Sequence, residues 1–414
     1  MKTDRDIVPL GNVIDTIIDR RGVTPFKLGS DWKDFGYKTL SARNVHTGEL
    51  VCLDQIRFVD EPTYRKWMPK EIQKGDILIT SEAPFGNVFY WNSEEKITLG
   101  QRLFAIRINK ENDSRYIYYS MITDSFQREL LRRCSGSTVT GLRQPELLKC
   151  ALLLPELSIQ KKIADVLSAL DQRIENLRAQ NRVLEQTAKT IYDYTFLQCA
   201  GHQTTYNKTL NRNIPTNWEV KSVNQMAKSC RGVAYDKSDV QKENNGGILV
   251  LRGNNIQDNN LVYDGNVVYI PETLVEENQH IKKGDVIMTM SSGSKEHIGK
   301  CTMFQYDSEH TYGAFLTKFT PNKECRYYFY MNLISEYFKA KIKSVCNGTG
   351  INNLTNQTFD EIFFPYPDSK TLDIFEKTVT PIFDKIGVNT KQIEALTTQR
   401  NTLLPLLMTG QVEV

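Results

Sequence analysis

One apolar stripe limits what this chain can fold into more than any other feature of its sequence. Between Ser158 and about Gln198, one column of residues is apolar at every seventh position, and a second column follows four residues on. The columns are Ile163, Leu170, Leu177, Leu184 and Ile191, then Leu167, Ile174, Asn181 and Ala188. A seam this narrow over several heptads is typical of a coiled-coil helix. At 1.5 Å per residue the helix would be about 60 Å long, so we expect a strut that needs a partner.

A second stripe of the same period predicts the partner. From Asp368 to the end of the chain, the columns are Phe375, Ile382, Asn389, Leu396 and Leu403, with Val379, Ile386, Ile393 and Leu407 beside them. The segment between the stripes would bring the chain back, which predicts an intramolecular antiparallel pair. Pro381 marks either a first helical position or a kink, and Pro405 is expected to end the helix.

Asn181 and Asn389 interrupt the two seams at positions where leucine would pack better. A buried asparagine in a seam usually fixes the register of the helices at a cost in stability. Antiparallel pairing of the seam centres brings these asparagines within about one helical turn of each other. We therefore predict that they lie close across the strut.

The rest of the sequence repeats itself at an offset of 209 to 212 residues. RGV at 21–23 recurs at 231–233, KGDILIT at 74–80 is answered by KGDVIMT at 283–289, and CSGSTVTGL at 134–142 by CNGTGINNL at 346–354. Two further matches, YKTLSARNV with ILVLRGNNI and LLLP with FFPYP, fall in the same order. Five ordered matches indicate an internal duplication.

The chain is thus predicted to consist of a globule (1–155), a helix (156–200), a second globule (201–367) and a second helix (368–414). Short apolar runs such as 76–80, 88–91, 103–108, 249–251 and 286–290 predict strands, and 115–133 and 325–345 predict helices. The expected fold class is α+β, with two similar globular domains separated by an antiparallel coiled coil of two long helices. Such a molecule would have approximate two-fold symmetry.

Composition excludes several classes of protein. No apolar run approaches the 18 to 20 residues of a membrane span, and the first ten residues lack an apolar signal core, so we expect a cytoplasmic protein. The eight cysteines are scattered without a CxxC pair, which predicts neither disulfides nor a metal site. A net charge of +3 is weak support for a polyanionic partner.

No short motif predicts catalysis. Around Gly293, Gly299 and Lys300 the glycine spacing does not fit a phosphate-binding loop, and Cys301 stands where a serine or threonine should hold magnesium. The segment NIPT at 213–216 lacks the second proline and the aromatic residue of an adenine-methylating motif. We therefore predict no catalytic, cofactor-binding or metal-binding residues in this chain.

The alternation of globules and helices, together with LGQRLFAIR at 99–107, SGSTVTGL at 135–142 and LLPLLMTGQV at 403–412, resembles the specificity subunit of type I restriction-modification systems. The resemblance covers essentially the whole chain. It implies two target-recognition domains, each reading one half of a bipartite, asymmetric site in double-stranded DNA, and helices that act as spacer and dock two methyltransferase subunits. It further implies S-adenosyl methionine and ATP in partner subunits, where adenine methylation and restriction with translocation occur. NGTGINNL and Pro381 depart from the usual pattern without breaking the layout.

Three groups of residues are candidate DNA contacts. The first is a small, hydroxyl-rich loop in each globule, suited to phosphates, although it is equally explained as a turn before the long helix. Its members are Ser135, Ser137, Thr138, Thr140 and Arg143 in the first globule and Asn347, Thr349, Asn352 and Asn353 in the second.

The second group follows an early strand in each globule. Arginine pairs with guanine and asparagine with adenine in the major groove, whereas turn chemistry explains the asparagines without DNA. These residues are Tyr37, Lys38, Ser41, Arg43, Asn44, Arg252, Asn254 and Asn255. The third group lies in loops beside later strands, which often serve recognition on a rigid scaffold. It comprises Ser81, Glu82, Phe85, Gly86, Gln101, Arg102, Ser291, Ser292, Ser294, Lys295 and Lys300.

The predicted function is therefore a non-catalytic DNA-recognition subunit. The alternative is a coiled-coil scaffold that recruits protein partners without binding DNA. An enzyme is disfavoured by the missing motifs. The target sequence, the gap between half-sites and the presence of a nuclease subunit do not follow from the residues.

Overall fold

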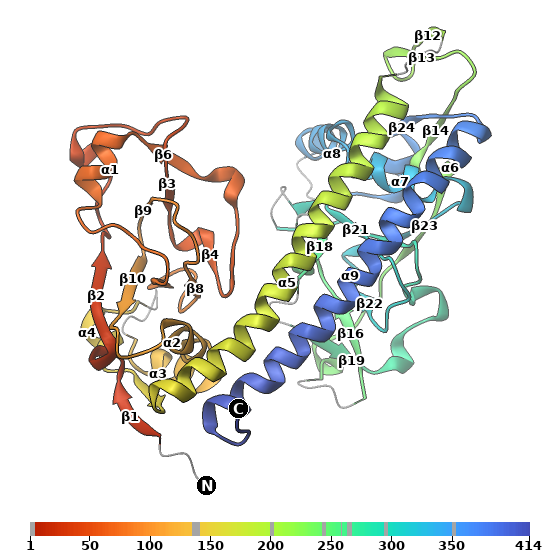
Figure 1. The fold of residues 1–414 in the computed structure, drawn as a ribbon. Coiled ribbons are helices and arrows are strands. Elements are labelled where there is room, and N and C mark those ends of the chain that lie inside the picture. Colours follow the sequence, from red (N-terminus) through yellow and green to blue (C-terminus); the bar gives the residue numbers. More distant parts are fainter. Residues whose placement is uncertain are drawn as a thin grey trace. The chain divides into compact units, whose positions relative to one another are not determined.

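The computed structural model describes residues 5–134, 141–198, 203–241, 246–257, 259–262, 267–293, 297–349 and 353–414. The chain forms two compact units (Figure 1). Unit 1 comprises Met1–Glu175 and Glu394–Val414, and unit 2 comprises Asn176–Ile393. Among the described residues, no helix is long and apolar enough to cross a membrane.

Unit 1 is built on two small sheets. The first is antiparallel, in the order β2 (Ile14–Asp19), β10 (Leu103–Ile108), β7 (Ile77–Thr80) and β8 (Val88–Tyr90). The second has the order β6 (Arg57–Val59), β3 (Tyr37–Leu40) and β9 (Ile97–Leu99), with β3 and β9 parallel. Two ribbons complete the unit, β1 (Asp6–Pro9) with β11 (Ala151–Leu154), and β4 (Val45–His46) with β5 (Glu49–Leu50).

Unit 2 repeats this topology strand for strand. Its four-stranded sheet has the order β15 (Ala227–Arg231), β23 (Leu316–Pro321), β20 (Val286–Thr289) and β21 (Cys301–Met303). Its three-stranded sheet has the order β19 (Val268–Ile270), β16 (Ile248–Leu251) and β22 (Thr311–Tyr312), again with one parallel pair. The ribbons are β14 (Glu219–Ser222) with β24 (Phe363–Tyr366), and β17 (Ile256–Gln257) with β18 (Asn260–Leu261). The predicted duplication is confirmed, with an added hairpin of β12 (Thr204–Asn207) and β13 (Arg212–Pro215).

The repeated KGD triplets have a structural explanation. In unit 1, Asp76 is buried, accepts a hydrogen bond from the main-chain nitrogen of Gln73 at 2.8 Å, and pairs with Arg107 of β10 at 2.7 Å. In unit 2, Asp285 is buried and accepts from Lys282 nitrogen at 2.8 Å, while the Lys318 ammonium of β23 lies 3.3 Å away. A buried carboxylate thus closes the turn before β7 or β20 and ties it to the neighbouring strand.

The helical runs predicted at 115–133 and 325–345 are present but each is divided into two helices, and three further short helices among the described residues were not predicted. The helices of unit 1 are α1 (Glu61–Trp67), α2 (Ser114–Met121), α3 (Asp124–Arg132) and α4 (Gln144–Leu148). Those of unit 2 are α6 (Val223–Met226), α7 (Arg326–Leu333) and α8 (Glu336–Thr349). Hydroxyl caps cause the breaks, since Thr123 Oγ1 accepts from Phe126 nitrogen and Ser335 Oγ accepts from Phe338 nitrogen.

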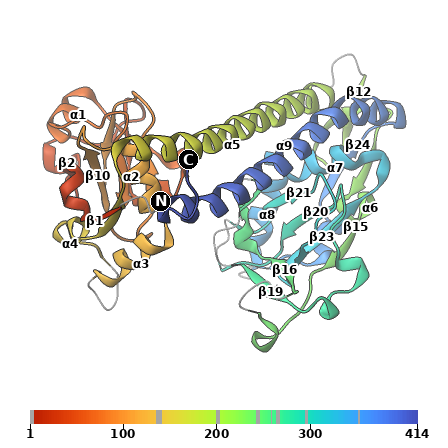
Figure 2. The ribbon, with the colours of Figure 1, turned by 60° about the horizontal axis from the view of Figure 1, so that its bottom comes forward.

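The two long helices are α5 (Leu157–Tyr192), which continues as a π-helical turn (Asp193–Leu197), and α9 (Ser369–Thr409). They run antiparallel in each unit. In unit 1, Asp171 pairs with Arg400, while Ile163 shares a core with Leu407. In unit 2, Asn181 bonds Asn389, and further on the Tyr192 ring lies 6.2 Å from the Phe375 ring. Figure 2 shows the helices side by side along unit 2.

The predicted seam is the buried face of both helices. Fully buried members are Ile163, Leu167, Ile174, Leu177, Ala188, Phe375, Val379, Ile386, Asn389 and Leu407. Half-buried members are Leu170, Asn181, Leu184, Ile191, Ile382, Ile393, Leu396 and Leu403. The contacts of Asn181 with Asn389 confirm the predicted register.

The expectation that Pro405 ends the second helix is wrong, and Pro381 also lies within one continuous helix. A proline removes one intrahelical hydrogen bond, and the packed seam on the opposite face outweighs that loss. The helix ends at Gly410, whose φ of +73° suits glycine. Gln411 nitrogen then bonds Leu406 oxygen and Gly410 nitrogen bonds Leu407 oxygen, which satisfies the last carbonyls.

Candidate nucleic-acid interface

Main-chain hydrogen bonds join four of the predicted recognition segments of unit 1 where the two central strands of its larger sheet, β7 and β10, meet their loops. Ser81 nitrogen, just after β7, donates to Arg102 oxygen, just before β10, at 2.9 Å. Leu142 nitrogen donates to Ser81 oxygen at 3.0 Å, and Ala42 nitrogen donates to Gln101 oxygen at 3.2 Å. We call this set of bonds the frame. It brings residues from separate parts of the sequence to one rim without using their side chains.

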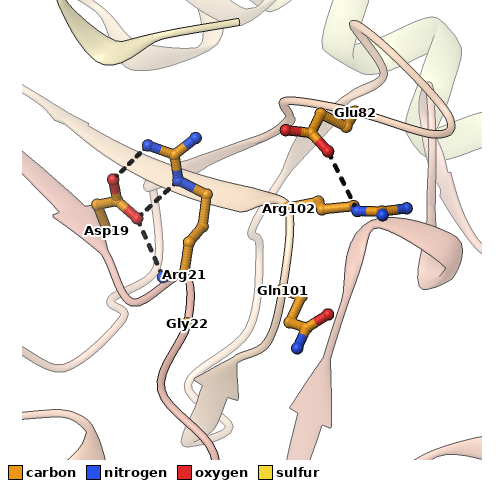
Figure 3. A pocket seen from close by; sticks show the side chains of 6 residues that line it. All are labelled: Asp19, Arg21, Gly22, Glu82, Gln101 and Arg102. Carbon is orange, nitrogen blue, oxygen red and sulfur yellow. Dashed lines mark hydrogen bonds and ion pairs between the residues drawn. The ribbon is translucent and has the colours of Figure 1, made fainter. Parts of the chain in front are cut away.

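The frame of unit 1 borders an open hollow of about 480 Å³. Figure 3 shows the side chains that line it, Asp19, Arg21, Gly22, Glu82, Gln101 and Arg102. Three of these, Glu82, Gln101 and Arg102, were predicted as DNA contacts. A concave, polar surface of this kind offers both donors and acceptors to a ligand.

Arg21 lines this hollow but was not among the residues predicted as DNA contacts. Its Nε and Nη2 donate to the two carboxylate oxygens of Asp19 at 2.9 and 2.8 Å, and its guanidinium carbon lies 4.0 Å from the centre of the Phe104 ring. Such a bidentate, stacked guanidinium is held rigidly. The RGV triplet that recurs in the sequence contains Arg21 and is the signal that could have identified this residue.

Arg102 is held more loosely. Its Nε lies 3.2 Å from Glu82 Oε2, and about half of its side-chain surface is exposed. Its φ is +63°, a left-handed conformation that non-glycine residues adopt at a cost of about 1 kcal/mol. Arg102 therefore presents an exposed guanidinium from a strained backbone position, with a carboxylate beside it.

Unit 2 repeats two of the three bonds of the frame, with different side chains around them. Met290 nitrogen donates to Phe315 oxygen at 2.9 Å, Leu354 nitrogen to Met290 oxygen at 2.8 Å, and Asn353 bridges Ser291. Because Leu103 pairs with Thr80 and Leu316 with Thr289, Phe315 occupies the position of Arg102 and Ser291 that of Glu82. The two rims are therefore alike in main chain and unlike in chemistry.

Strand register also corrects the alignment of the RGV triplets. Asp19 lies opposite Phe104 in unit 1, whereas Arg231 lies opposite Thr317, the equivalent of Phe104, in unit 2. Arg231 thus takes the place of Asp19 in the sheet rather than that of Arg21. Its Nε donates to Ala314 oxygen at 3.1 Å, so an arginine again meets the rim but from a different position.

The two turn asparagines predicted as adenine readers are structural. Asn44 is buried, its side-chain oxygen accepts from Ser41 nitrogen at 3.0 Å, and its amide donates to Val51 and Cys52 oxygens. Asn255 is buried likewise, accepts from Arg252 nitrogen at 2.9 Å and donates to Val262 oxygen. Turn chemistry, the alternative explanation, accounts for both residues, so we withdraw them as base readers.

Other predicted contacts are divided between core and surface. Ser81 is fully buried, Phe85 packs on the core of unit 1, and Gly86 oxygen accepts from Gln127. Tyr37 is stacked on Tyr64 at 4.2 Å, and burial raises the pKa of the Tyr64 phenol. These residues support the loops and strands around the rim.

The exposed or half-exposed predicted residues keep their candidacy as DNA contacts. Lys38 pairs with Glu95 at 2.9 Å and Arg43 donates to Gln55 oxygen at 2.9 Å. Ser41, Arg143, Arg252, Asn254, Ser291, Ser292, Lys300 and Asn353 also keep some surface accessible. Asn347 and Thr349 lie in α8. Ser135, Ser137, Thr138, Thr140, Ser294, Lys295 and Asn352 lie outside the described residues.

The described part of the chain contains no group of three or more histidine, cysteine, aspartate or glutamate side chains that could hold a metal ion. The hollow of unit 1 itself combines two arginines with two carboxylates and an amide. Arginines donate hydrogen bonds, carboxylates accept them and an amide does both, so the hollow can bond to a ligand that carries donors and acceptors.

Comparison with known proteins defines the class. The family model of the type I restriction modification DNA specificity domain matches residues 16–186 and 215–398. The chain therefore belongs to the type I restriction-modification DNA specificity family.

Relatives extend the similarity over the whole chain. The type I restriction enzyme MjaIX specificity subunit of Methanocaldococcus jannaschii is 26% identical over 364 residues, which cover 86% of this chain and 82% of that protein. The putative MjaX specificity subunit of the same organism is 24% identical over 99% of this chain and 94% of its own length. The type I restriction-modification S subunit of M. genitalium shares the fold, with a TM-score of 0.56 at 16% identity over 98% of this chain and 96% of that chain.

Proposed function

We propose that this chain is the DNA-reading subunit of a type I restriction-modification complex, and that each unit contacts one half of a bipartite, asymmetric DNA site. The observation that carries the proposal is the frame, of which two main-chain hydrogen bonds recur in unit 2 with different side chains around them. Two similar scaffolds place their DNA-contacting side chains in comparable positions. Because these side chains differ between the units, the two units should recognise different sequences.

The paired helices α5 and α9 are proposed to act as the spacer and to dock two methyltransferase subunits. Their seam faces are buried against each other within each unit, while their outer faces carry the charged residues of the heptads. We further propose that S-adenosyl methionine and ATP bind to partner subunits, that adenine methylation and any cleavage occur there, and that the complex works in the cytoplasm. This chain would then supply recognition without catalysis.

A net charge of +3 supports weak DNA binding by the chain alone, because affinity that depends on phosphate contacts grows with the number of cations. The partners would supply the remaining contacts. Affinity of the isolated chain should fall as salt rises.

The test is a genome-wide profile of methylated adenines in cells that express the partner methyltransferase with and without this chain. A bipartite motif that is methylated only when the chain is present supports the proposal. Gel shifts with the co-expressed complex provide an independent measure. A complex that assembles but binds no DNA would favour the protein-recruiting scaffold instead.

A further inference from the structure

The hollow of unit 1 contains two arginines, Arg21 and Arg102, which differ in how their guanidinium groups are bonded. The guanidinium of Arg21 donates two hydrogen bonds to the carboxylate of Asp19. The same carboxylate also accepts from the Arg21 main-chain nitrogen at 3.0 Å. Its Nη1 points to Leu142 oxygen at 3.5 Å, so it braces the frame. Arg102 meets Glu82 through Nε, and its terminal nitrogens extend beyond that contact (Figure 3).

The backbone conformation at Arg102 is unusual for an arginine. A position with φ of +63° is most easily occupied by glycine or asparagine. Strain at an exposed residue beside a hollow is a reason to look for a function of that residue. The arginine occupies this position at some cost in stability, and about half of its side-chain surface is exposed.

Arg102 and Glu82 together match one kind of base pair. In the major groove, guanine offers two acceptors, O6 and N7, which a guanidinium binds in a bidentate manner, while the cytosine amine is a donor that a carboxylate accepts. A donor fork with an acceptor 3.2 Å away therefore suits the two edges of a G·C pair. A T·A or A·T pair does not offer two adjacent acceptors on one purine.

Unit 2 lacks this chemistry at the equivalent place. Phe315 stands for Arg102 and is two-thirds exposed, Ser291 stands for Glu82, and Ala314 stands for Gln101. An exposed phenyl ring makes apolar contact with a base and provides no bidentate hydrogen bonding. Phe315 therefore serves as the comparison for Arg102 at the equivalent position of unit 2.

We propose that Arg102 and Glu82 specify a G·C base pair in the half-site that unit 1 contacts, with Arg102 on guanine and Glu82 on the paired or adjacent cytosine. This inference rests on the proposed function and names the base class that one of its sites recognises. Arg21 and Asp19 are positioning residues that fix the rim.

The test uses the complex of the full chain with its co-expressed methyltransferase partner and a library of randomised DNA, from which bound sequences are selected and read. Arg102→Ala should relax preference at one G·C position of one half-site, with about 5- to 150-fold weaker binding to the wild-type sequence. Phe315→Ala should leave that position unchanged. Arg65→Ala, which removes an exposed arginine paired with Glu61 on α1, is the control and should change neither affinity nor preference.

Two further variants separate base reading from phosphate contact. Arg102→Lys keeps the charge but loses the planar fork, so preference should still relax. Glu82→Gln should weaken selection at the same or the adjacent base pair. If Arg102→Ala weakens all sequences uniformly and leaves the base preference intact, the guanidinium contacts phosphate and the inference is overturned. A wild-type complex without sequence preference would instead refute the proposed function itself.

Discussion

The side-chain amide of Asn389 donates a hydrogen bond to the side-chain oxygen of Asn181 at 2.9 Å across the two long helices. Asn389 is fully buried and also reaches Gln180 at 3.3 Å, while Asn181 donates to Thr390 at 3.4 Å. A buried polar pair in an otherwise apolar seam can form its hydrogen bond in one register only. The pair therefore fixes how far one helix is displaced along the other within unit 2.

Cysteines at these two positions should form a disulfide. In Asn181→Cys/Asn389→Cys we expect rapid bond formation under mild oxidation, because the two side chains are already in contact. Mass spectrometry of the linked peptides measures the yield. The control is Asn181→Cys/Val388→Cys, since exposed Val388 points about 100° away around the helix. Similar yields for both pairs would contradict the register.

Asp171 should stabilise unit 1 measurably. It accepts from the Tyr119 hydroxyl at 2.7 Å and pairs with Arg400 at 2.9 Å, which ties α2, α5 and α9 together. Asp171→Asn should lower the free energy of unfolding by about 1–2 kcal/mol, because both partners are largely removed from water.

Asp165→Asn serves as the matched control for that change. Asp165 also pairs with an arginine, Arg115, at 2.8 Å, but its side chain is two-thirds exposed. The cost should stay below about 0.5 kcal/mol, as for most exposed pairs. Urea denaturation of both variants gives the comparison, and equal losses would show that Asp171 has no special structural role.

The buried KGD carboxylates should be among the most sensitive positions of the fold. Asp76→Ala would leave Arg107 with the main-chain oxygen of Glu71 but no carboxylate, and Asp285→Ala would leave the buried Lys318 ammonium without its carboxylate. Each change should cost about 3–5 kcal/mol. Asp34→Ala, at an exposed position, should be nearly neutral. Thermal and urea unfolding measure the losses, and a loss below about 1 kcal/mol would refute the assigned role.

Glu376 should make unit 2 less stable as pH rises. Its carboxylate accepts from Tyr327 and Tyr328 nitrogens at 2.9 Å, and burial raises its pKa above the usual value despite these bonds. The folded chain then binds more protons than the unfolded chain between about pH 4.3 and the raised pKa. The free energy of unfolding therefore falls as pH rises through that interval, and the cost persists at higher pH.

Glu376→Gln keeps an acceptor for both main-chain nitrogens and removes the charge. The variant should lose this pH dependence and gain stability at pH 7 relative to wild type, with the difference vanishing near pH 4. Urea unfolding at pH 4, 5.5 and 7.5 measures it. Glu361→Gln, at an exposed position of the same unit, is the control. A destabilised Glu376→Gln protein at pH 7 would show that the charged hydrogen bonds outweigh burial.

Much of the fold was predictable from the sequence because the residues that specify it recur in heptads or in duplicated motifs. The heptads predicted both long helices, and the asparagines in them predicted a contact that is present. The duplicated motifs predicted two like units before any strand pairing was known. Pro405 misled, because a local rule about proline ignores the packed seam that continues to Met408.

The candidate site was only partly predictable, since its residues meet through tertiary structure. Glu82, Gln101 and Arg102 were named from loop positions, but nothing in the sequence indicated that they share a hollow with Arg21 and Asp19. Asn44 and Asn255 show the opposite error, because a residue that suits a base edge also suits a turn. Register, rather than likeness of triplets, identified Phe315 as the counterpart of Arg102.

The frame around Ser81 and its counterpart around Met290 is closed by main-chain atoms alone. Side chains that face the hollow without bracing the frame, such as Arg102 and its counterpart Phe315, can therefore be exchanged without disturbing these bonds. Each copy is free to acquire a new preference while the other keeps its own, so a chain of this design can explore new pairs of targets one half at a time.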